Sequence, residues 1–76
     1  MNRREFRNAV TNRRIIIETG IVIGRTGARL VAVELVEATY CWLWTVRSLP
    51  DGAVLRNGCA GSESTARRVA TEGGVQ

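Results

Sequence analysis

The chain of 76 residues contains no histidine and no lysine, and only one proline and two cysteines. Without histidine, neither cysteine has the usual general base beside it, so a cysteine nucleophile is not supported. Two cysteines without histidine are also a poor ligand set for a structural metal. We therefore expect no catalysis, no metal and no cofactor, which leaves the binding of another molecule as the class of function.

Long apolar runs are also missing. Residues 1–14 are polar and carry no apolar core of a secretory signal. The most apolar stretch, 28–46, is interrupted by Arg29, Glu34 and Glu37, which argues against a membrane-spanning helix. We expect a cytoplasmic protein with no membrane partner.

Positive charge is concentrated at the start of the chain. Residues 1–14 carry five Arg and one Glu (5 − 1 = +4), while the remaining residues carry six Arg and six acidic residues and sum to zero. The exclusive use of Arg fits the codon usage of a GC-rich genome, or a need for bidentate contacts to phosphate. The candidate phosphate contacts are Arg3, Arg4, Arg7, Arg13 and Arg14.

The segment 40–47 holds both tryptophans and the only tyrosine, and it alternates with a period of two. Such alternation of aromatic and β-branched residues predicts a strand. The sequence Ser48-Leu49-Pro50-Asp51-Gly52 is typical of a turn, so 53–59 is expected to return as the second strand of a hairpin.

Two further strands are expected upstream. Residues 13–23 are expected to be extended and are rich in Ile, with a possible bulge or bend at Thr19-Gly20. Residues 28–37 alternate as a strand, with a weaker helical alternative. An exposed edge formed by Ile15–Ile23 would permit a homodimer by strand pairing. Residues 2–10 are compatible with a short helix that docks through Phe6, or with a flexible arm.

A C-terminal helix begins after Ser62, a favourable N-cap, and bears a narrow stripe of Ala66, Val69 and Ala70. We expect this stripe to pack on Trp42 and Trp44. The predicted fold is α+β, with a small antiparallel sheet of three to four strands in meander order and the helix on one face. Residues 1–14 would form a basic arm or short helix, and 15–74 a single domain.

Pairing of Arg47 with Ala53 would place Cys41 opposite Cys59, either as a disulfide or as two reduced thiols. The same pairing sets Trp44 beside Arg56, which is either an aromatic–arginine binding platform or part of the core. Arg67 and Arg68 lie on the predicted helix, either as a solvated face or as an extension of the basic surface. The candidate binding residues are therefore the five N-terminal Arg with Trp44, Arg56, Arg67 and Arg68.

The pattern over residues 40–72 resembles the β-β-α modules of short accessory proteins of bacteriophages and mobile elements, which include anti-CRISPR inhibitors. It is carried by these residues: Trp42-x-Trp44-x-Val46, Pro50-Asp51-Gly52, Gly58-Cys59-Ala60-x-Ser62 and Ala66-Arg67-Arg68-x-Ala70. The resemblance implies a viral, non-catalytic inhibitor in the cytoplasm of a bacterial host. Its target would be a host protein or ribonucleoprotein complex, although the basic charge departs from the acidic character of many anti-CRISPR proteins.

Two functions follow. In the first, the protein inhibits or regulates a host complex that handles nucleic acid, through protein–protein contact. In the second, it is a small DNA- or RNA-binding module that uses the Arg-rich N-terminus. The neutral charge of the body favours the first, since nucleic-acid binders spread positive charge over the domain face.

Overall fold

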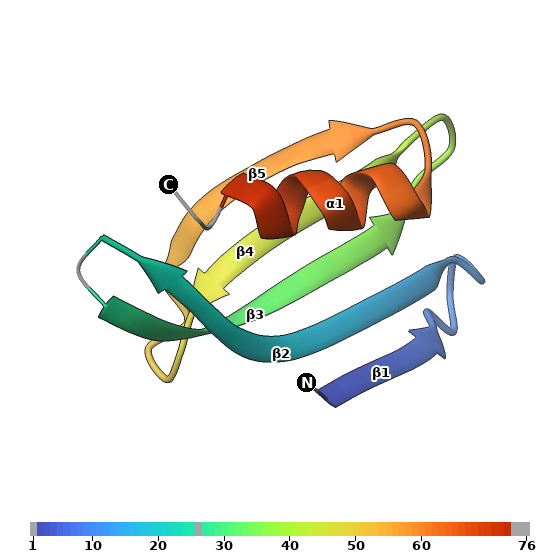
Figure 1. The fold of residues 1–76 in the computed structure, drawn as a ribbon. Coiled ribbons are helices and arrows are strands. Elements are labelled where there is room, and N and C mark those ends of the chain that lie inside the picture. Colours follow the sequence, from blue (N-terminus) through green and yellow to red (C-terminus); the bar gives the residue numbers. More distant parts are fainter. Residues whose placement is uncertain (1, 26, 74–76) are drawn as a thin grey trace.

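The computed structural model describes residues 2–25 and 27–73, which form a five-stranded antiparallel sheet and one helix (Figure 1). The elements are β1 (Asn2–Arg7), β2 (Arg14–Gly24), β3 (Gly27–Glu37), β4 (Trp42–Ser48), β5 (Val54–Ala60) and α1 (Glu63–Gly73). The strands lie side by side in chain order, so the predicted α+β class and meander are confirmed. The predicted strand number is wrong, because there are five strands rather than three to four. The predicted segments 1–14 and 15–74 also include Met1, Thr26 and Gly74, which lie outside the described residues.

The additional strand is β1, within the segment expected to be a short helix or an arm. It pairs antiparallel with the first half of β2, from Arg7 opposite Arg14 to Asn2 opposite Thr19. Extended backbone gives its side chains two alternating directions. Phe6 then lies opposite Ile15, and the carboxylate of Glu5 lies 3.0 Å from the guanidinium of Arg14. These contacts stabilise the strand where local propensity does not.

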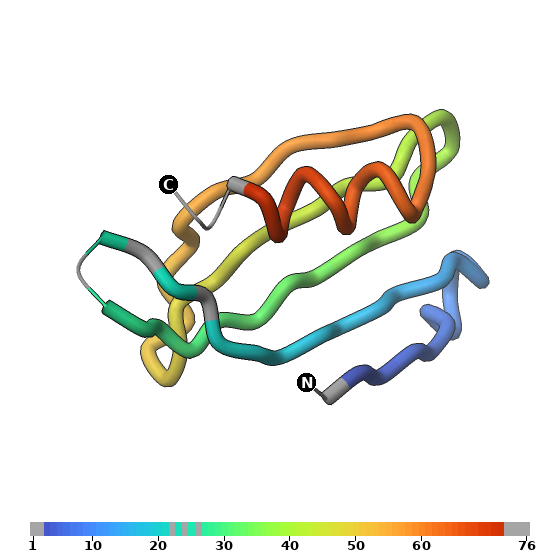
Figure 2. Tube along the Cα trace, in the orientation of Figure 1, coloured from blue at the N-terminus to red at the C-terminus, as the bar shows by residue number. Residues whose placement is uncertain are grey.

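Strands β2 and β3 are 11 residues long and pair in an unbroken register, without the bulge expected at Thr19-Gly20. The strand prediction for 28–37 is confirmed over the helical alternative. The β2–β3 hairpin extends beyond the start of β1, as Figure 2 shows. We call this extension, residues 20–24 and 27–30, the ribbon. Gly27 opens β3 with φ of 116°, a conformation that other residues adopt only with strain.

The register of β4 and β5 differs from the prediction by two residues. Leu43, rather than Cys41, lies opposite Cys59. One residue of the shift arises at the turn, where Arg47 pairs with Val54 instead of Ala53, and the second arises at the irregularity between Val46 and Arg47. The predicted direct pairing of the two cysteines is therefore wrong. A shift of two residues leaves every side chain on its predicted face. Trp44 and Arg56 consequently remain on the same side of the sheet.

The helix packs as predicted. Ser62 Oγ accepts the backbone N–H of Thr65 at 3.2 Å, which confirms the N-cap. Ala66 and Ala70 are fully buried, and their small side chains let α1 lie close to the Trp44 ring. The core is completed by the following residues: Ile16, Val31, Val33, Leu35 and Val46, with Trp42, Ala60 and Val69 packed against it.

Candidate functional site

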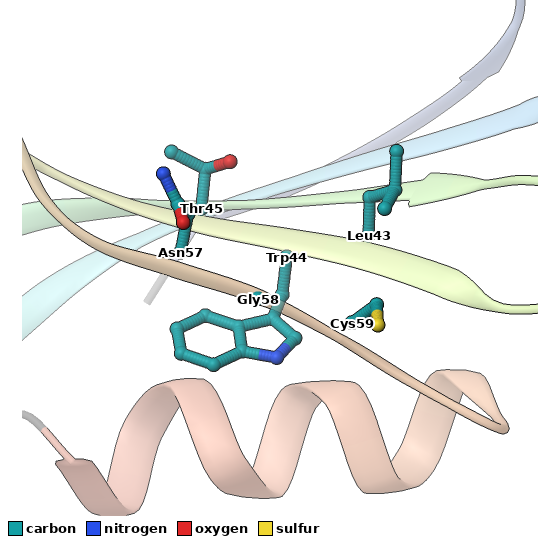
Figure 3. A pocket seen from close by; sticks show the side chains of 6 residues that line it. All are labelled: Leu43, Trp44, Thr45, Asn57, Gly58 and Cys59. Atoms are coloured by element: carbon teal, nitrogen blue, oxygen red, sulfur yellow. The ribbon is translucent and has the colours of Figure 1, made fainter.

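The two faces of the sheet have different surroundings. Helix α1 packs on one face, where the ring of Trp44 lies between the sheet and the helix (Figure 3). Leu43 and Thr45, the residues on either side of Trp44, point away from the helix. We call these two sides the covered face and the uncovered face.

The uncovered face carries a continuous line of apolar residues. Directly opposed residues of antiparallel strands project to the same side of a sheet. Successive cross-strand pairs give one such line, Phe6–Ile15–Val36–Leu43–Cys59, which crosses all five strands. We call it the apolar row. At about 4.8 Å between strands, it spans roughly 19 Å.

Much of the apolar row is accessible to solvent. Phe6 and Leu43 are each 46% exposed, Cys59 is exposed, and Ile15 and Val36 are half-buried. The next line of residues on this face is mainly polar, with Arg4, Ile17, Glu34, Thr45 and Asn57 in register. An apolar strip bordered by polar groups is the usual composition of a protein-contact surface.

A shallow depression lies beside the apolar row, between β4 and β5 (Figure 3). Its volume is about 360 Å³, and its lining residues are Leu43, Trp44, Thr45, Asn57, Gly58 and Cys59. The hydroxyl of Thr45 and the amide of Asn57, which are opposite one another, add hydrogen-bonding groups to its apolar lining. The depression is large enough to receive a side chain of a partner molecule.

Two arginines of the predicted basic N-terminus, Arg3 and Arg14, are paired with carboxylates on the covered face. Glu63 of α1 lies 3.0 Å from Arg14 and 3.8 Å from Arg3. Glu5 also binds both arginines, and its hydrogen bond raises the pKa of the Arg14 guanidinium above the ordinary value. Arg67 binds the buried carboxylate of Glu18 at 2.5 Å and also reaches Glu63. Three arginines and three glutamates thus form one balanced cluster.

The remaining predicted cations are scattered. Arg7 donates to the carbonyl oxygen of Asn12 at 3.0 Å, and Arg13 donates to Thr39 Oγ1 at 2.6 Å. Arg4 and Arg68 are exposed and take part in none of the ion pairs among the described residues. Arg4 lies in β1 and Arg68 in α1, so the structure does not bring these side chains into one basic patch.

Trp44 and Arg56 do meet, but inside the fold. The guanidinium carbon of Arg56 lies 5.0 Å from the centre of the Trp44 ring, and Trp44 is only 6% exposed. Arg56 also donates to the carbonyl oxygens of Val69 and Ala70 at 3.4 Å, near the end of α1. The pair therefore holds the helix on the sheet and offers no free ring face to a ligand.

Both cysteines are free and lie near one another at the end of the apolar row. Cys59 is exposed and Cys41 is half-buried. Burial raises the pKa of the Cys41 thiol, and the charge and hydrogen bonding of the neighbouring Cys59 raise it further. The raised pKa makes the Cys41 thiol less reactive than an ordinary cysteine thiol.

The sequence analysis did not predict the apolar row, because it sought the binding surface among the arginines and the Trp44–Arg56 pair. Leu43 and Val36 were identifiable as strand residues that alternate with the core, but nothing local marked them as exposed. Phe6 could be placed only after β1 was known to pair with β2. The row is a product of register across five strands.

Among the described residues, no group of three or more acidic or cysteine side chains is arranged to hold a metal ion. Helix α1, the single helix in the part of the chain that the structure describes, is too short and too polar to cross a membrane. Comparison with protein-family models, with curated proteins and with solved structures finds no match for this chain.

Proposed function

We propose that this chain is a non-catalytic binding protein that recognises a partner protein through the uncovered face of its sheet. The observation that carries the proposal is the apolar row, with two large side chains each 46% exposed. The row and the depression beside it provide both an apolar strip and polar groups that fix orientation. In keeping with the phage-type resemblance, the partner would be a component of a host complex that handles nucleic acid, and binding would inhibit or regulate that complex.

Electrostatics favour protein over nucleic acid as the direct partner. Arg3, Arg14 and Arg67 are neutralised by carboxylates of the same chain. Arg47 on the uncovered face is likewise paired with Glu34. A nucleic-acid surface would need several unpaired cations on one side, each contributing to a salt-dependent affinity. Of the candidate phosphate contacts in the N-terminal segment, Arg4, Arg7 and Arg13 form no ion pair among the described residues, but Arg4 and Arg7 lie three residues apart in β1 and project to opposite faces.

The test is affinity capture from a bacterial lysate with three immobilised forms of the full chain. These are the unmodified chain, Leu43→Asp in the apolar row, and Val10→Asp in the β1–β2 loop. Val10 is 93% exposed, so the second variant makes the same chemical change at an exposed site outside the row. The lysate is treated with nuclease so that contacts bridged by nucleic acid are removed.

We expect one protein partner to bind the unmodified chain and Val10→Asp equally. Leu43→Asp should weaken that binding by at least about tenfold, because a charge would replace an apolar contact near the centre of the interface. Equal capture by all three forms would remove the apolar row from the site. Capture that disappears on nuclease treatment and falls steeply with salt would instead support the nucleic-acid function.

A further inference from the structure

The ribbon is the part of the sheet with the fewest neighbours. Strand β1 covers β2 only up to Thr19, and β4 pairs with β3 only from Val31 onward. Within residues 2–25 and 27–73, no strand lies on the outer side of the β2 segment Gly20–Gly24. The backbone N–H and C=O groups on that side are therefore available to another strand.

The ribbon also exposes an apolar face. Ile21 lies opposite Leu30 and Ile23 opposite Ala28, so these side chains share one side of the hairpin. Ile21 is 67% exposed, Ile23 is 70% exposed and Leu30 is 48% exposed. A two-stranded hairpin is marginal in water unless further strands widen its apolar face. The ribbon thus lacks both an edge partner and a cover.

The sequence of the open edge is a palindrome. Gly20-Ile21-Val22-Ile23-Gly24 reads the same in both directions and contains no charged residue. When two copies pair antiparallel about Val22, each position is matched with one that adds to 44. Gly20 then lies opposite Gly24 and Ile21 opposite Ile23, so like residues face one another across the two-fold axis that relates the copies.

We propose that the ribbon is a dimerisation site, at which the Gly20–Gly24 edge of β2 pairs antiparallel with the same edge of a second copy of this chain. The pairing makes a four-stranded sheet in the order β3-β2-β2-β3. Ile21, Ile23 and Leu30 of both copies then lie on one face of it. This site is separate from the apolar row.

The length of the open edge fits this pairing. Within each copy, the described pairing of β1 with β2 ends at Asn2, which lies opposite Thr19. In the proposed dimer, β2 of the other copy ends at Gly24, which would lie opposite Gly20. The arriving strand therefore stops where β1 begins. The five-residue edge and the five-residue segment match without overlap among the described residues.

The surface of the free chain is also large. A monomer of 8.3 kDa is expected to expose roughly 4,600 Å², whereas this chain exposes 5136 Å². Pairing of two five-residue edges covers only a small part of this surface, so the expected dimer is small and reversible.

The other edges of the sheet are less suitable for a second copy. The exposed edge of β1 carries Arg3, Arg4, Glu5 and Arg7, and such charges oppose edge-to-edge pairing. The β5 edge has one charged residue, Arg56, but its strand meets β4 through the irregularity beside Val46. Its sequence has no self-complementary register like that of Gly20–Gly24. The predicted homodimer edge Ile15–Ile23 is correspondingly reduced to its last residues, because β1 covers the rest.

The experiment compares the mass of four full-length forms in solution by sedimentation equilibrium over a concentration series. The first form is the unmodified chain, expected to approach twice 8.3 kDa at high concentration. Ile21→Lys/Ile23→Lys would place four ammonium groups together across the axis. Ile21→Lys/Ile23→Glu would instead place each introduced Lys opposite an introduced Glu. Leu55→Lys changes the β5 edge and serves as the positional control.

We expect Ile21→Lys/Ile23→Lys to raise the dimer dissociation constant by on the order of 100-fold, because the two Ile21–Ile23 cross-strand pairs are lost and like charges replace them. The Ile21→Lys/Ile23→Glu dimer should dissociate much less than the Ile21→Lys/Ile23→Lys dimer. The two variants differ only in the charge introduced at position 23. Both isoleucines are mostly exposed in the single chain, so near-ultraviolet signals of the buried Trp44 should be unchanged in all forms.

A monomeric mass of the unmodified chain at every soluble concentration would overturn the proposal and leave the ribbon to a different partner. A dimer that is weakened by Leu55→Lys but not by the Ile21/Ile23 variants would overturn it in favour of the β5 edge. Equal dissociation of the two double variants would show that the isoleucines do not face one another across the axis.

Discussion

The covered and uncovered faces are built from alternate residues of the same strands, yet their side chains differ in exposure to solvent. Trp44 is 6% exposed and its neighbour Leu43 is 46% exposed. The difference comes from α1, which contacts β3, β4 and β5 on one side only. One helix of 11 residues is about 16 Å long and can cover a single face of so small a sheet. The buried core is therefore concentrated on one side, and the other side keeps apolar side chains accessible to solvent.

The strongest way to break this asymmetry is Trp44→Ala. The substitution removes the largest side chain between the sheet and α1, and leaves a cavity beside Ala66 and Ala70. We expect a loss of about 3–5 kcal/mol in the free energy of unfolding, a large part of the total for a chain of this size. Urea denaturation followed by circular dichroism measures it. A loss below about 1 kcal/mol would mean that the ring is not a core element.

A smaller effect is expected for Gly58→Ala, also on the covered face. A Cβ at Gly58 would lie 2.7 Å from the Trp44 ring, so the ring would have to move. We expect a destabilisation of about 1–3 kcal/mol, as for other overpacked cores. Gly61→Ala is the matched control, because nothing lies within 4 Å of its Cβ position. Equal effects of both substitutions would show that backbone freedom, rather than the ring, decides the cost.

The thiols give a chemical test of the uncovered face. Because Cys59 helps to raise the pKa of Cys41, Cys59→Ala should lower that pKa and increase the thiolate fraction of Cys41 at about pH 8. Alkylation of Cys41 by iodoacetamide should then become a few-fold faster, while burial keeps it slower than a free thiol. An unchanged rate would indicate that the two thiols do not interact. Mass spectrometry of the modified chain gives the rate for Cys41 alone.

The smallest effect on stability is expected for Leu43→Thr. Threonine keeps the preference for a strand, and the side chain at this position is already half in solvent. The free energy of unfolding should change by less than about 0.5 kcal/mol, whereas partner binding should weaken. A destabilisation as large as that of Gly58→Ala would assign Leu43 to the core and remove the contrast between the two faces.

Alternation and capping signals were sufficient to predict the part of the fold that is locally determined. Trp42 and Trp44, the small residues of α1 and the N-cap Ser62 are all placed as their pattern predicts. The strand β1 was missed because its stability comes from distant partners, with Glu5 and Arg3 bound to residues of β2 and α1. Local propensity carries no information about such contacts.

The candidate site was harder to predict than the fold. Nothing in the sequence gives the irregularity beside Val46, which sets the register of Cys59 opposite Leu43. Arg56 and Trp44 were correctly expected to be close, but proximity does not reveal that both serve the helix. The positions of exposed apolar residues depend on which face α1 occupies, and that is decided by packing of the whole chain.

The meander order also has a consequence for the rate of folding. Each strand lies beside its neighbour in the sequence, so every β-hairpin closes over a short loop and contacts form quickly. The bond from Arg67 to Glu18 is different, because it joins residues separated by 49 positions. We expect such bonds to form after the transition state. Glu18→Gln should therefore accelerate unfolding and leave the refolding rate nearly unchanged.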